Sequence, residues 1–193
     1  MAQIALFHSV LGVRPGVLEA ADRLRAAGHD VRVVDQYDGR VFDDYAEASA
    51  YAESIGYPAL MARAVDLVAD LPEGFVAMGF SNGGGMAEYV ATRRAVSKVV
   101  QLSGTMPLAM LDAGPWPAAI PVQIHYALDD PFRNQDWIDA FIAEVRTAGA
   151  ALGLHLDYPG RGHLFTDATL PEEYDAQSTE LLWKRVISFV NDR

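Results

Sequence analysis

Short apolar runs alternate along this chain with longer segments whose apolar side chains recur every three or four residues. The short runs show little polar alternation, which is typical of strands covered on both faces of a sheet. The longer segments have the spacing of amphipathic helices. We expect strands at residues 4–7, 31–34, 75–80, 98–102, 122–126 and 152–158. We expect helices at residues 17–27, 46–71, 83–92, 137–148 and 172–190, the second of them split in two by Gly56 and Pro58.

Strands that alternate with helices of this length form βαβ units, which pair their strands in parallel. We therefore predict an α/β fold with a mostly parallel central sheet and helices on both faces. The 193 residues, of which 51% are hydrophobic, supply enough apolar material for one domain over residues 1–193. One irregular segment is long, residues 104–119, and its apolar side chains could line a pocket, act as a lid or complete the core. Those side chains are Met106, Leu108, Met110, Leu111 and Trp116.

Asp and Glu number 26 against 15 Lys and Arg, which gives the chain a formal net charge of −11. So acidic a chain lacks the clustered cations that bind nucleic acid or an anionic membrane, and small-molecule chemistry stays open. Because there is no cysteine, disulfides, thiolate metal sites and a cysteine nucleophile are excluded. We see no targeting segment and no run near the roughly 18 apolar residues of a membrane span. We expect a cytoplasmic protein, monomeric or a small homo-oligomer.

The sharpest local motif is Gly79-Phe80-Ser81-Asn82-Gly83, between a predicted strand and a predicted helix. A serine on a tight strand-to-helix turn has strained backbone, and its neighbours two positions away must be small. Its hydroxyl then projects above the edge of the sheet. The amide of Asn82 faces the same space at a helix N-terminus, where it can stabilise an oxyanion. The alternative interpretation is a glycine-rich turn that only lets the helix pack closely.

A serine hydroxyl needs a base to become a nucleophile. His163 stands out among five histidines, because it follows a predicted strand in the turn Pro159-Gly160-Arg161-Gly162-His163. His8 ends the first predicted strand and could line a site at the same edge of the sheet. The remaining histidines lie in predicted strands or in a turn, where a structural role is the simpler interpretation (His29, His125 and His155).

The base in turn needs a carboxylate that orients the imidazole. Asp129 and Asp130 both follow the strand predicted at residues 122–126, and Pro131 then turns the chain. An aspartate there is often only a turn residue or a helix cap. The order serine, aspartate, histidine is nevertheless that of α/β-hydrolases. The residues alone leave open whether Asp129 or Asp130 is the partner.

The chain resembles the dienelactone hydrolase family of α/β-hydrolases over nearly its whole length. Five segments carry the resemblance: Ser9-Val10-Leu11-Gly12, Val34-Asp35-Gln36-Tyr37, Gly79-Phe80-Ser81-Asn82-Gly83-Gly84, Ala127-Leu128-Asp129-Asp130-Pro131-Phe132 and Tyr158-Pro159-Gly160-Arg161-Gly162-His163-Leu164-Phe165. The resemblance implies an α/β-hydrolase fold with Ser81 as nucleophile, His163 as base and Asp130 as its partner. It also implies an oxyanion hole formed by the backbone amides of Val10 and Asn82.

The chain departs from the family at two positions. The founding enzymes resemble one another in a cysteine nucleophile and a nearby glutamate, where this chain has Ser81 and Ser9. They also hold an anionic substrate with an arginine four residues after the histidine, and that position is Asp167 here. We therefore expect a neutral or cationic ester in place of a dianionic dienelactone. We expect the substrate pocket to include Ser9, Leu11, Met106, Met110 and Trp116.

The predicted function is a serine hydrolase that cleaves a carboxylic ester, a lactone or a related acyl bond, without a metal or cofactor. A thioesterase, perhydrolase or phospholipase-like esterase would use the same three residues. A small-molecule binding protein without catalysis on this fold is a further alternative. A nucleotide- or flavin-binding domain would need a glycine-rich phosphate loop after the first strand, and residues 9–14 read Ser-Val-Leu-Gly-Val-Arg.

Overall fold

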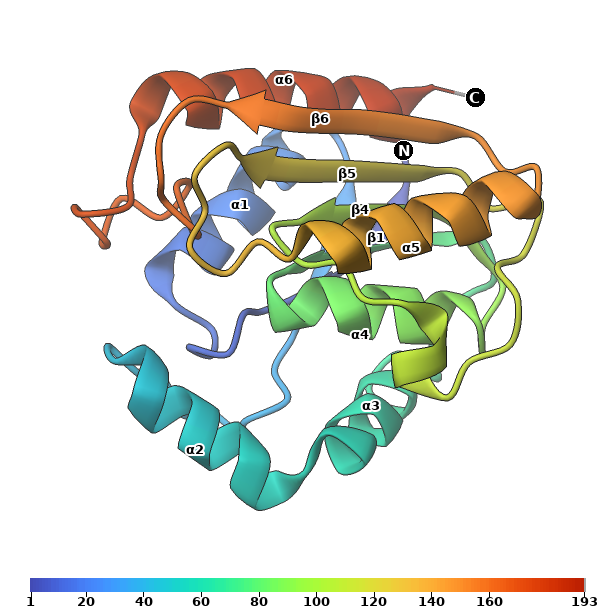
Figure 1. The fold of residues 1–193 in the computed structure, drawn as a ribbon, viewed down its shortest axis with the longest axis horizontal. Helices are drawn as coiled ribbons and strands as arrows, with labels where there is room; N and C mark the ends of the chain where they lie inside the picture. Colours follow the sequence, from blue (N-terminus) through green and yellow to red (C-terminus); the bar gives the residue numbers. More distant parts are fainter. Residues whose placement is uncertain (193) are drawn as a thin grey trace.

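The computed structural model describes residues 1–192, and six parallel strands form one central sheet within them. The strands lie in the order β2-β1-β3-β4-β5-β6 (Figure 1). Their bounds are β1 (Gln3–Phe7), β2 (Asp30–Val34), β3 (Phe75–Phe80), β4 (Val96–Leu102), β5 (Val122–Ala127) and β6 (Leu152–Tyr158). Each strand of the sheet falls on a run predicted from its apolar character, so the predicted fold class is confirmed.

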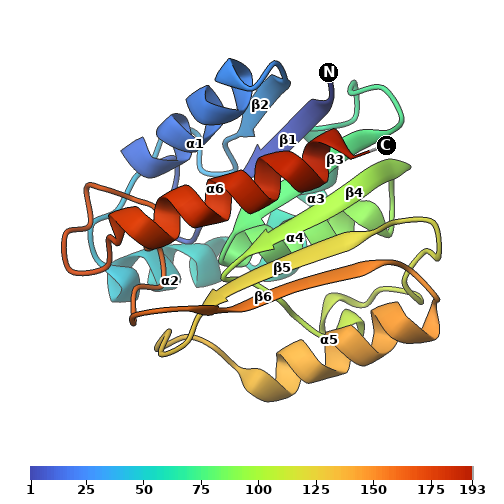
Figure 2. The ribbon, with the colours of Figure 1, turned by 90° about the horizontal axis from the view of Figure 1, so that it is seen from above.

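Helices cover both faces of this sheet. α1 (Pro15–Ala26) and α6 (Ala176–Asn191) pack on one face, as the view from above shows (Figure 2). α3 (Tyr57–Asp66), α4 (Asn82–Ala91) and α5 (Gln135–Thr147) lie on the other, and α2 (Tyr45–Ile55) precedes α3 on that side (Figure 1). No helix within residues 1–192 is both long and apolar enough to cross a membrane.

Two helix boundaries have clear local causes. Gly56, with φ 88°, ends α2 and starts α3, so the predicted split at this glycine is confirmed. The last helix begins at Ala176 and not at residue 172. Asp175 caps it by accepting a 2.6 Å hydrogen bond from the backbone N–H of Ser178. Glu173 lies outside the helix, and its carboxylate accepts hydrogen bonds from Tyr45 and Leu164.

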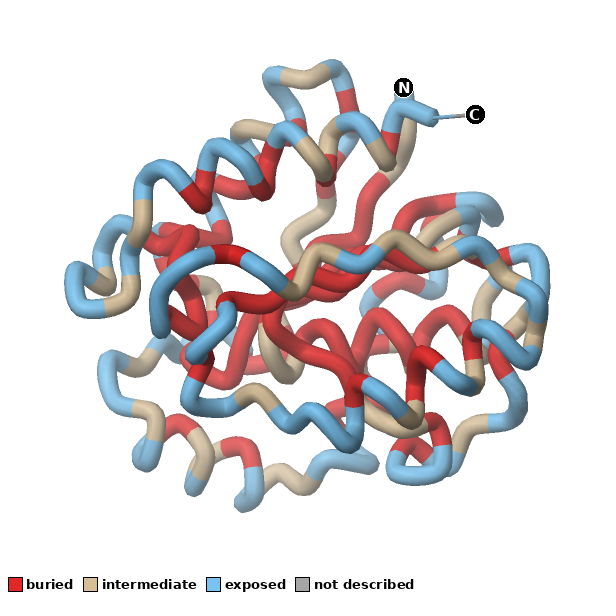
Figure 3. Tube along the Cα trace, turned by 45° about the horizontal axis from the view of Figure 1, so that its top comes forward, coloured by how far each residue is buried: buried red, intermediate tan, exposed pale blue. Residues whose placement is uncertain are grey.

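The core lies where the sheet meets the helices. Every residue of β3 and of β5 is buried, as expected for central strands covered on both faces. Buried positions run through the strands and along the inward sides of the helices in Figure 3. The segment 104–119 is partly regular, because residues Leu108–Leu111 form a short 3-10 helix whose two end leucines are buried.

The order of the strands indicates where on the sheet a functional site should lie. β1 pairs with β2 on one side and with β3 on the other, so the chain reverses its direction of winding between β1 and β3. Parallel sheets bind ligands beyond the carboxyl ends of their strands at such a reversal. The loops that follow β1 and β3 therefore meet at this point, and the loops after β5 and β6 lie along the same edge.

Candidate active site

Ser81 stands on a sharp turn between β3 and α4. Its backbone has φ 51° and ψ −119°, a conformation that costs a non-glycine residue free energy and that strand-to-helix turns bearing an exposed serine adopt. Its N–H donates a 2.7 Å hydrogen bond to the carbonyl of Leu102, and its carbonyl accepts a 2.8 Å bond from Gly84. The turn is therefore held by hydrogen bonds on both sides of the serine.

The glycines around Ser81 leave room for this turn. A Cβ on Gly83 would lie 2.5 Å from the carbonyl oxygen of Phe7 at the end of β1. A Cβ on Gly79 would overlap the carbonyl of Gly83, and one on Gly104 would overlap the carbonyl of Ser81. These contacts explain physically why small residues flank the serine at a spacing of two.

The imidazole of His163 bridges the serine and an aspartate. Its Nε2 lies 2.8 Å from Ser81 Oγ, and its Nδ1 lies 2.8 and 2.9 Å from the two carboxylate oxygens of Asp130. His163 and Asp130 are buried, whereas Ser81 is partly exposed. With the Nδ1 proton donated to Asp130, Nε2 is the acceptor for the serine hydroxyl. The structure thus brings together three residues that are far apart in the sequence.

The two candidate aspartates occupy different surroundings. Asp129 is exposed, and its backbone N–H donates to the carbonyl of Gly160. Asp130 is buried beneath His163, and one of its carboxylate oxygens also accepts a 2.8 Å hydrogen bond from the N–H of Phe132. The geometry therefore pairs Asp130, and not Asp129, with the imidazole.

Two backbone N–H groups next to the serine are free to bind an anion. Val10 lies in the loop after β1, and Asn82 is the first residue of α4. Neither N–H donates to a protein acceptor within residues 1–192. Two hydrogen bonds hold the loop that carries Val10: Ser9 Oγ accepts from the N–H of Leu11 at 3.2 Å, and the N–H of Gly12 donates to the carbonyl of Ser9 at 3.1 Å. An oxygen bound there would lie at a helix N-terminus.

The other histidines have structural partners. His8 Nε2 accepts a 3.0 Å hydrogen bond from the N–H of Gln36, and burial lowers the pKa of this imidazole. His125 is fully buried in β5 between Tyr158 and Gln123, and burial lowers its pKa well below the usual value. His29 accepts from the N–H of Ala2. Nowhere in the described residues do three or more potential ligands gather in the arrangement of a metal site.

A pocket of about 290 Å³ opens in front of Ser81. Val10, Asn82, Met106 and His163 line it, together with five aromatic side chains: Tyr45, Tyr57, Tyr126, Phe132 and Trp137. None of these aromatic residues was predicted from the sequence. Tyr126 lies near the carboxyl end of β5, and Phe132 and Trp137 follow that strand beyond Asp130, so their place after a strand that reaches the site was the available signal. They come from α2, α3, β5, α5 and the turn before α5, which only the tertiary fold brings together.

Four residues expected in the pocket lie elsewhere. Trp116 is buried against Phe141, and its indole N–H donates to the carbonyl of Ile120 at 2.9 Å, so it completes the core. Met110 is half exposed on the short 3-10 helix and does not line the pocket. Ser9 and Leu11 are buried and do not line the pocket, and the Ser9 hydroxyl accepts a hydrogen bond from the backbone N–H of Leu11. Met106 is the expected member that does line the pocket.

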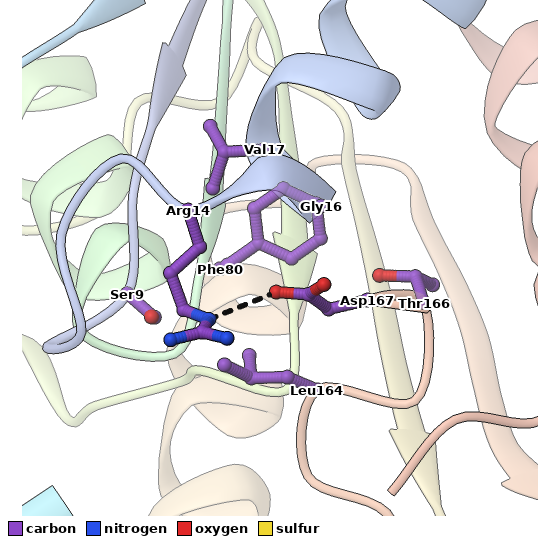
Figure 4. A pocket seen from close by; sticks show the side chains of 8 residues that line it. All are labelled: Ser9, Arg14, Gly16, Val17, Phe80, Leu164, Thr166 and Asp167. Carbon is purple, nitrogen blue, oxygen red and sulfur yellow. Dashed lines mark hydrogen bonds and ion pairs between the residues drawn. The ribbon is translucent and has the colours of Figure 1, made fainter. Parts of the chain in front are cut away.

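Asp167 does not face the pocket either. Its carboxylate lies 3.1 Å from Nε of Arg14, and both side chains are buried (Figure 4). The same guanidinium also donates to Asp43, to the carbonyl of Phe42 and to Thr169. Asp167 therefore serves this ion pair, and its position gives no information about the charge of a substrate.

Glu173 is a further residue near the site that no sequence motif singled out. One of its carboxylate oxygens accepts a 2.8 Å hydrogen bond from the hydroxyl of Tyr45 in the pocket wall. The other accepts from the N–H of Leu164, the residue after His163, at 2.6 Å. Glu173 thus joins helix α2 to the histidine turn. No local motif indicates this role, because the three residues are distant in the sequence.

Comparison with known proteins gives one family and one fold. The dienelactone hydrolase family model matches residues 2–193. The solved structure of m3DLH is similar with a TM-score of 0.81 and 22% identity, over 97% of this chain and 84% of that one. A dienelactone hydrolase-like promiscuous phosphotriesterase from metagenomic libraries has a TM-score of 0.81 and 20% identity, over 98% of this chain and 85% of that one. An alpha/beta hydrolase enzyme from a Medee basin deep-sea metagenome library has a TM-score of 0.70 and 16% identity, over 98% of this chain and 84% of that one. No curated protein matches the chain.

Proposed function

The chain is a hydrolase that belongs to the dienelactone hydrolase family, and from this premise we propose that it cleaves carboxylic esters through an acyl intermediate on Ser81. The observation that carries the proposal is the continuous hydrogen-bonded chain from Ser81 Oγ through His163 to Asp130. A hydroxyl bonded to a neutral imidazole, itself bonded to a buried carboxylate, is the arrangement that activates a serine.

In the first half of the proposed reaction, Ser81 Oγ attacks the ester carbonyl carbon while His163 Nε2 takes the hydroxyl proton. The Asp130 carboxylate stabilises the imidazolium that forms. The N–H groups of Val10 and Asn82 donate to the negatively charged oxygen of the tetrahedral intermediate. The imidazolium then returns its proton to the departing alcohol oxygen, and the acyl group stays on Ser81.

In the second half, a water molecule replaces the alcohol. His163 Nε2 accepts a proton from the water as its oxygen attacks the acyl carbon, and the same two N–H groups bind the new oxyanion. The imidazolium protonates Ser81 Oγ when the acyl–serine bond breaks. The free acid leaves, and the serine hydroxyl is restored. A serine hydroxyl is less acidic than a thiol, so this chain depends more on the His163–Asp130 pair than a cysteine enzyme does.

Hydrolysis of p-nitrophenyl acetate tests the proposal. We expect the wild-type protein to turn the ester over and Ser81→Ala to lose at least about a thousandfold in kcat/KM. A fluorophosphonate probe should label the wild type at Ser81, as located by mass spectrometry of the modified peptide. A wild type that neither turns the ester over nor reacts with the probe would overturn the proposal. Labelling at a different residue would overturn the assignment of Ser81.

A thioester or a lactone is a second candidate bond, because the same hydrogen-bonded chain and the same two N–H groups would serve any acyl transfer to water. A panel of matched oxygen esters, thioesters and lactones separates these activities by kcat/KM. A binding protein without catalysis is excluded if the probe labels Ser81. The monomeric or small homo-oligomeric state, the cytoplasmic location and a single domain over residues 1–193 stay predictions.

A further inference from the structure

Five of the fifteen residues that line the pocket carry aromatic rings. Tyr45, Tyr57, Tyr126, Phe132 and Trp137 line it. Two of these rings also pack against the base: Phe132 lies 4.7 Å and Tyr45 6.1 Å from the imidazole of His163, measured between ring centroids. The rings of Tyr45 and Phe132 are 5.0 Å apart. A group that enters the pocket to reach Ser81 can therefore contact several π-systems.

The pocket also lacks positive charge. None of its lining residues, all of which lie in the described part of the chain, is a lysine or an arginine. A neighbouring hollow shares Tyr45, Phe132 and His163, and its charged members are Arg161, Glu172 and Glu173. The two carboxylates outnumber the one guanidinium there. The surroundings of the site therefore favour a cation over an anion.

One carboxylate acts directly on the aromatic wall. Glu173 accepts the hydrogen bond of the Tyr45 hydroxyl, and burial together with this carboxylate raises the pKa of Tyr45. The phenol is thus neutral and donates a hydrogen bond to the carboxylate, which increases the electron density on the ring. The attraction of a cation to a ring face grows with that electron density.

We propose that this pocket selects esters that carry a quaternary or tertiary ammonium group over neutral esters of the same shape and over anionic esters. The inference deepens the proposed esterase function and rests on it, because it concerns the substrate of the same site. A desolvated cation is attracted to the face of an aromatic ring, and the net charge of −11 adds a long-range attraction. An anionic ester meets no cation in the wall to offset its lost hydration.

Three thioacetates of similar size test the selection. They are acetylthiocholine, its neutral isostere 3,3-dimethylbutyl thioacetate, and a thioacetate whose alkyl group ends in a carboxylate. The released thiol can be read with a disulfide reagent, because the chain contains no cysteine that would react. We expect kcat/KM to be about tenfold higher for the cationic than for the neutral thioester, and lowest for the anionic one. Equal values for the cationic and neutral thioesters, or a preference for the anion, would overturn the inference and leave the hydrolase proposal standing.

Substitutions in the pocket distinguish the effect of the aromatic rings on selectivity from the effect of the protein's overall negative charge. Trp137→Leu and Tyr57→Leu should each lower the ratio of cationic to neutral kcat/KM toward one. Tyr174→Leu is the matched control, since Tyr174 is as exposed as Trp137 and does not line the pocket, and it should keep the wild-type ratio. At about 1 M sodium chloride, where the Debye length is roughly 3 Å, most of the ratio should persist. A ratio that collapses in salt and ignores both wall variants would overturn a role for the rings.

Binding without turnover gives an independent reading. In Ser81→Ala, the indole N–H resonance of Trp137, identified by its loss in Trp137→Phe, is followed in titrations with choline and with neutral 3,3-dimethylbutanol. We expect choline to shift it at about tenfold lower concentration. An equal response to both, or a response to neither, would overturn the inference. A wild type that hydrolyses no ester and reacts with no probe would overturn the proposed function alone. The titration would still show whether the pocket prefers a cationic ligand over a neutral one.

Discussion

The guanidinium of Arg14 and the carboxylate of Asp167 form a buried ion pair between residues 153 positions apart in the sequence. Arg14 directly precedes α1, in the loop that also carries Val10. Asp167 lies four residues after His163, in the loop that follows β6. The pair therefore ties the loop of the proposed oxyanion hole to the loop of the proposed base, beside the small hollow drawn in Figure 4.

Removal of one partner of this pair should destabilise the fold strongly. In Asp167→Ala the guanidinium loses its buried carboxylate and keeps the exposed Asp43, so we expect a loss that approaches the roughly 3–5 kcal/mol typical of breaking a buried pair. Urea denaturation measures the change. Glu180→Ala is the control, because Glu180 pairs with Arg23 at the surface, where an ion pair contributes about 1 kcal/mol or less. Equal losses in the two variants would contradict a special role for the buried pair.

The choice between the two aspartates makes a second prediction. Asp130→Asn should lower kcat for p-nitrophenyl acetate by roughly 10²–10⁴-fold, because an amide can neither fix the imidazole tautomer nor stabilise the imidazolium. Asp129→Asn is the matched control, since Asp129 is exposed next to it, and should change kcat less than about threefold. Circular dichroism and urea curves show whether both variants keep the fold. A larger loss in the Asp129 variant would reverse the assignment.

The sequence could predict those parts of the site that depend on a single turn. The spacing of Gly79, Ser81 and Gly83 follows from contacts within that turn and with β1, so it is visible in the chain itself. The turn residues alone could not choose between Asp129 and Asp130, because both follow β5 within the same turn, and only the family resemblance implied Asp130. Their difference arises from the fold, which buries one carboxylate under His163 and leaves the other at the surface.

The wall of the pocket shows what the sequence could not reveal. Trp116 was expected in the pocket, yet its indole N–H donates to the carbonyl of Ile120 only four residues away and its ring packs against Phe141 in the core. Tyr45 and Phe132 do meet in the wall, although 87 positions separate them. Such a contact depends on where α2 runs after the turn that follows β2. Neither apolar periodicity nor motif spacing fixes that direction.

A third prediction concerns the close approach of α4 to β1. Gly83→Ala would place a Cβ 2.5 Å from the carbonyl oxygen of Phe7, so backbone must shift. We expect a loss of about 2 kcal/mol or more in the free energy of unfolding, together with lower activity, because Ser81 would move with the turn. Gly114→Ala is the control, since no atom lies within 4 Å of its Cβ position, and should be neutral or stabilising by about 0.4–1 kcal/mol. Equal stability of the two variants would contradict the packing argument.

The last prediction concerns Glu88, a carboxyl group buried in α4 behind the pocket. One of its oxygens accepts from the backbone N–H of Met106 at 3.1 Å and from the side chain of Gln101. Its other oxygen has no hydrogen-bond partner in the described residues. Burial, the largest cause, raises the pKa of Glu88 well above its usual value. We therefore expect the folded protein to hold Glu88 in its protonated form.

A raised carboxyl pKa makes stability fall as pH rises. The unfolded chain loses the Glu88 proton near pH 4.3, while the folded chain keeps it, so the folded state binds more protons over the range above that pH. Within this range the group lowers the free energy of unfolding by about 1.4 kcal/mol per pH unit. Glu88→Gln cannot ionise and should lose this contribution, so its stability relative to the wild type should rise between about pH 5 and the raised pKa. Urea curves across that range measure the difference, with exposed Glu53→Gln as the control that should run parallel to the wild type. Parallel curves for Glu88→Gln would show that the buried carboxyl does not carry an extra proton in the folded state.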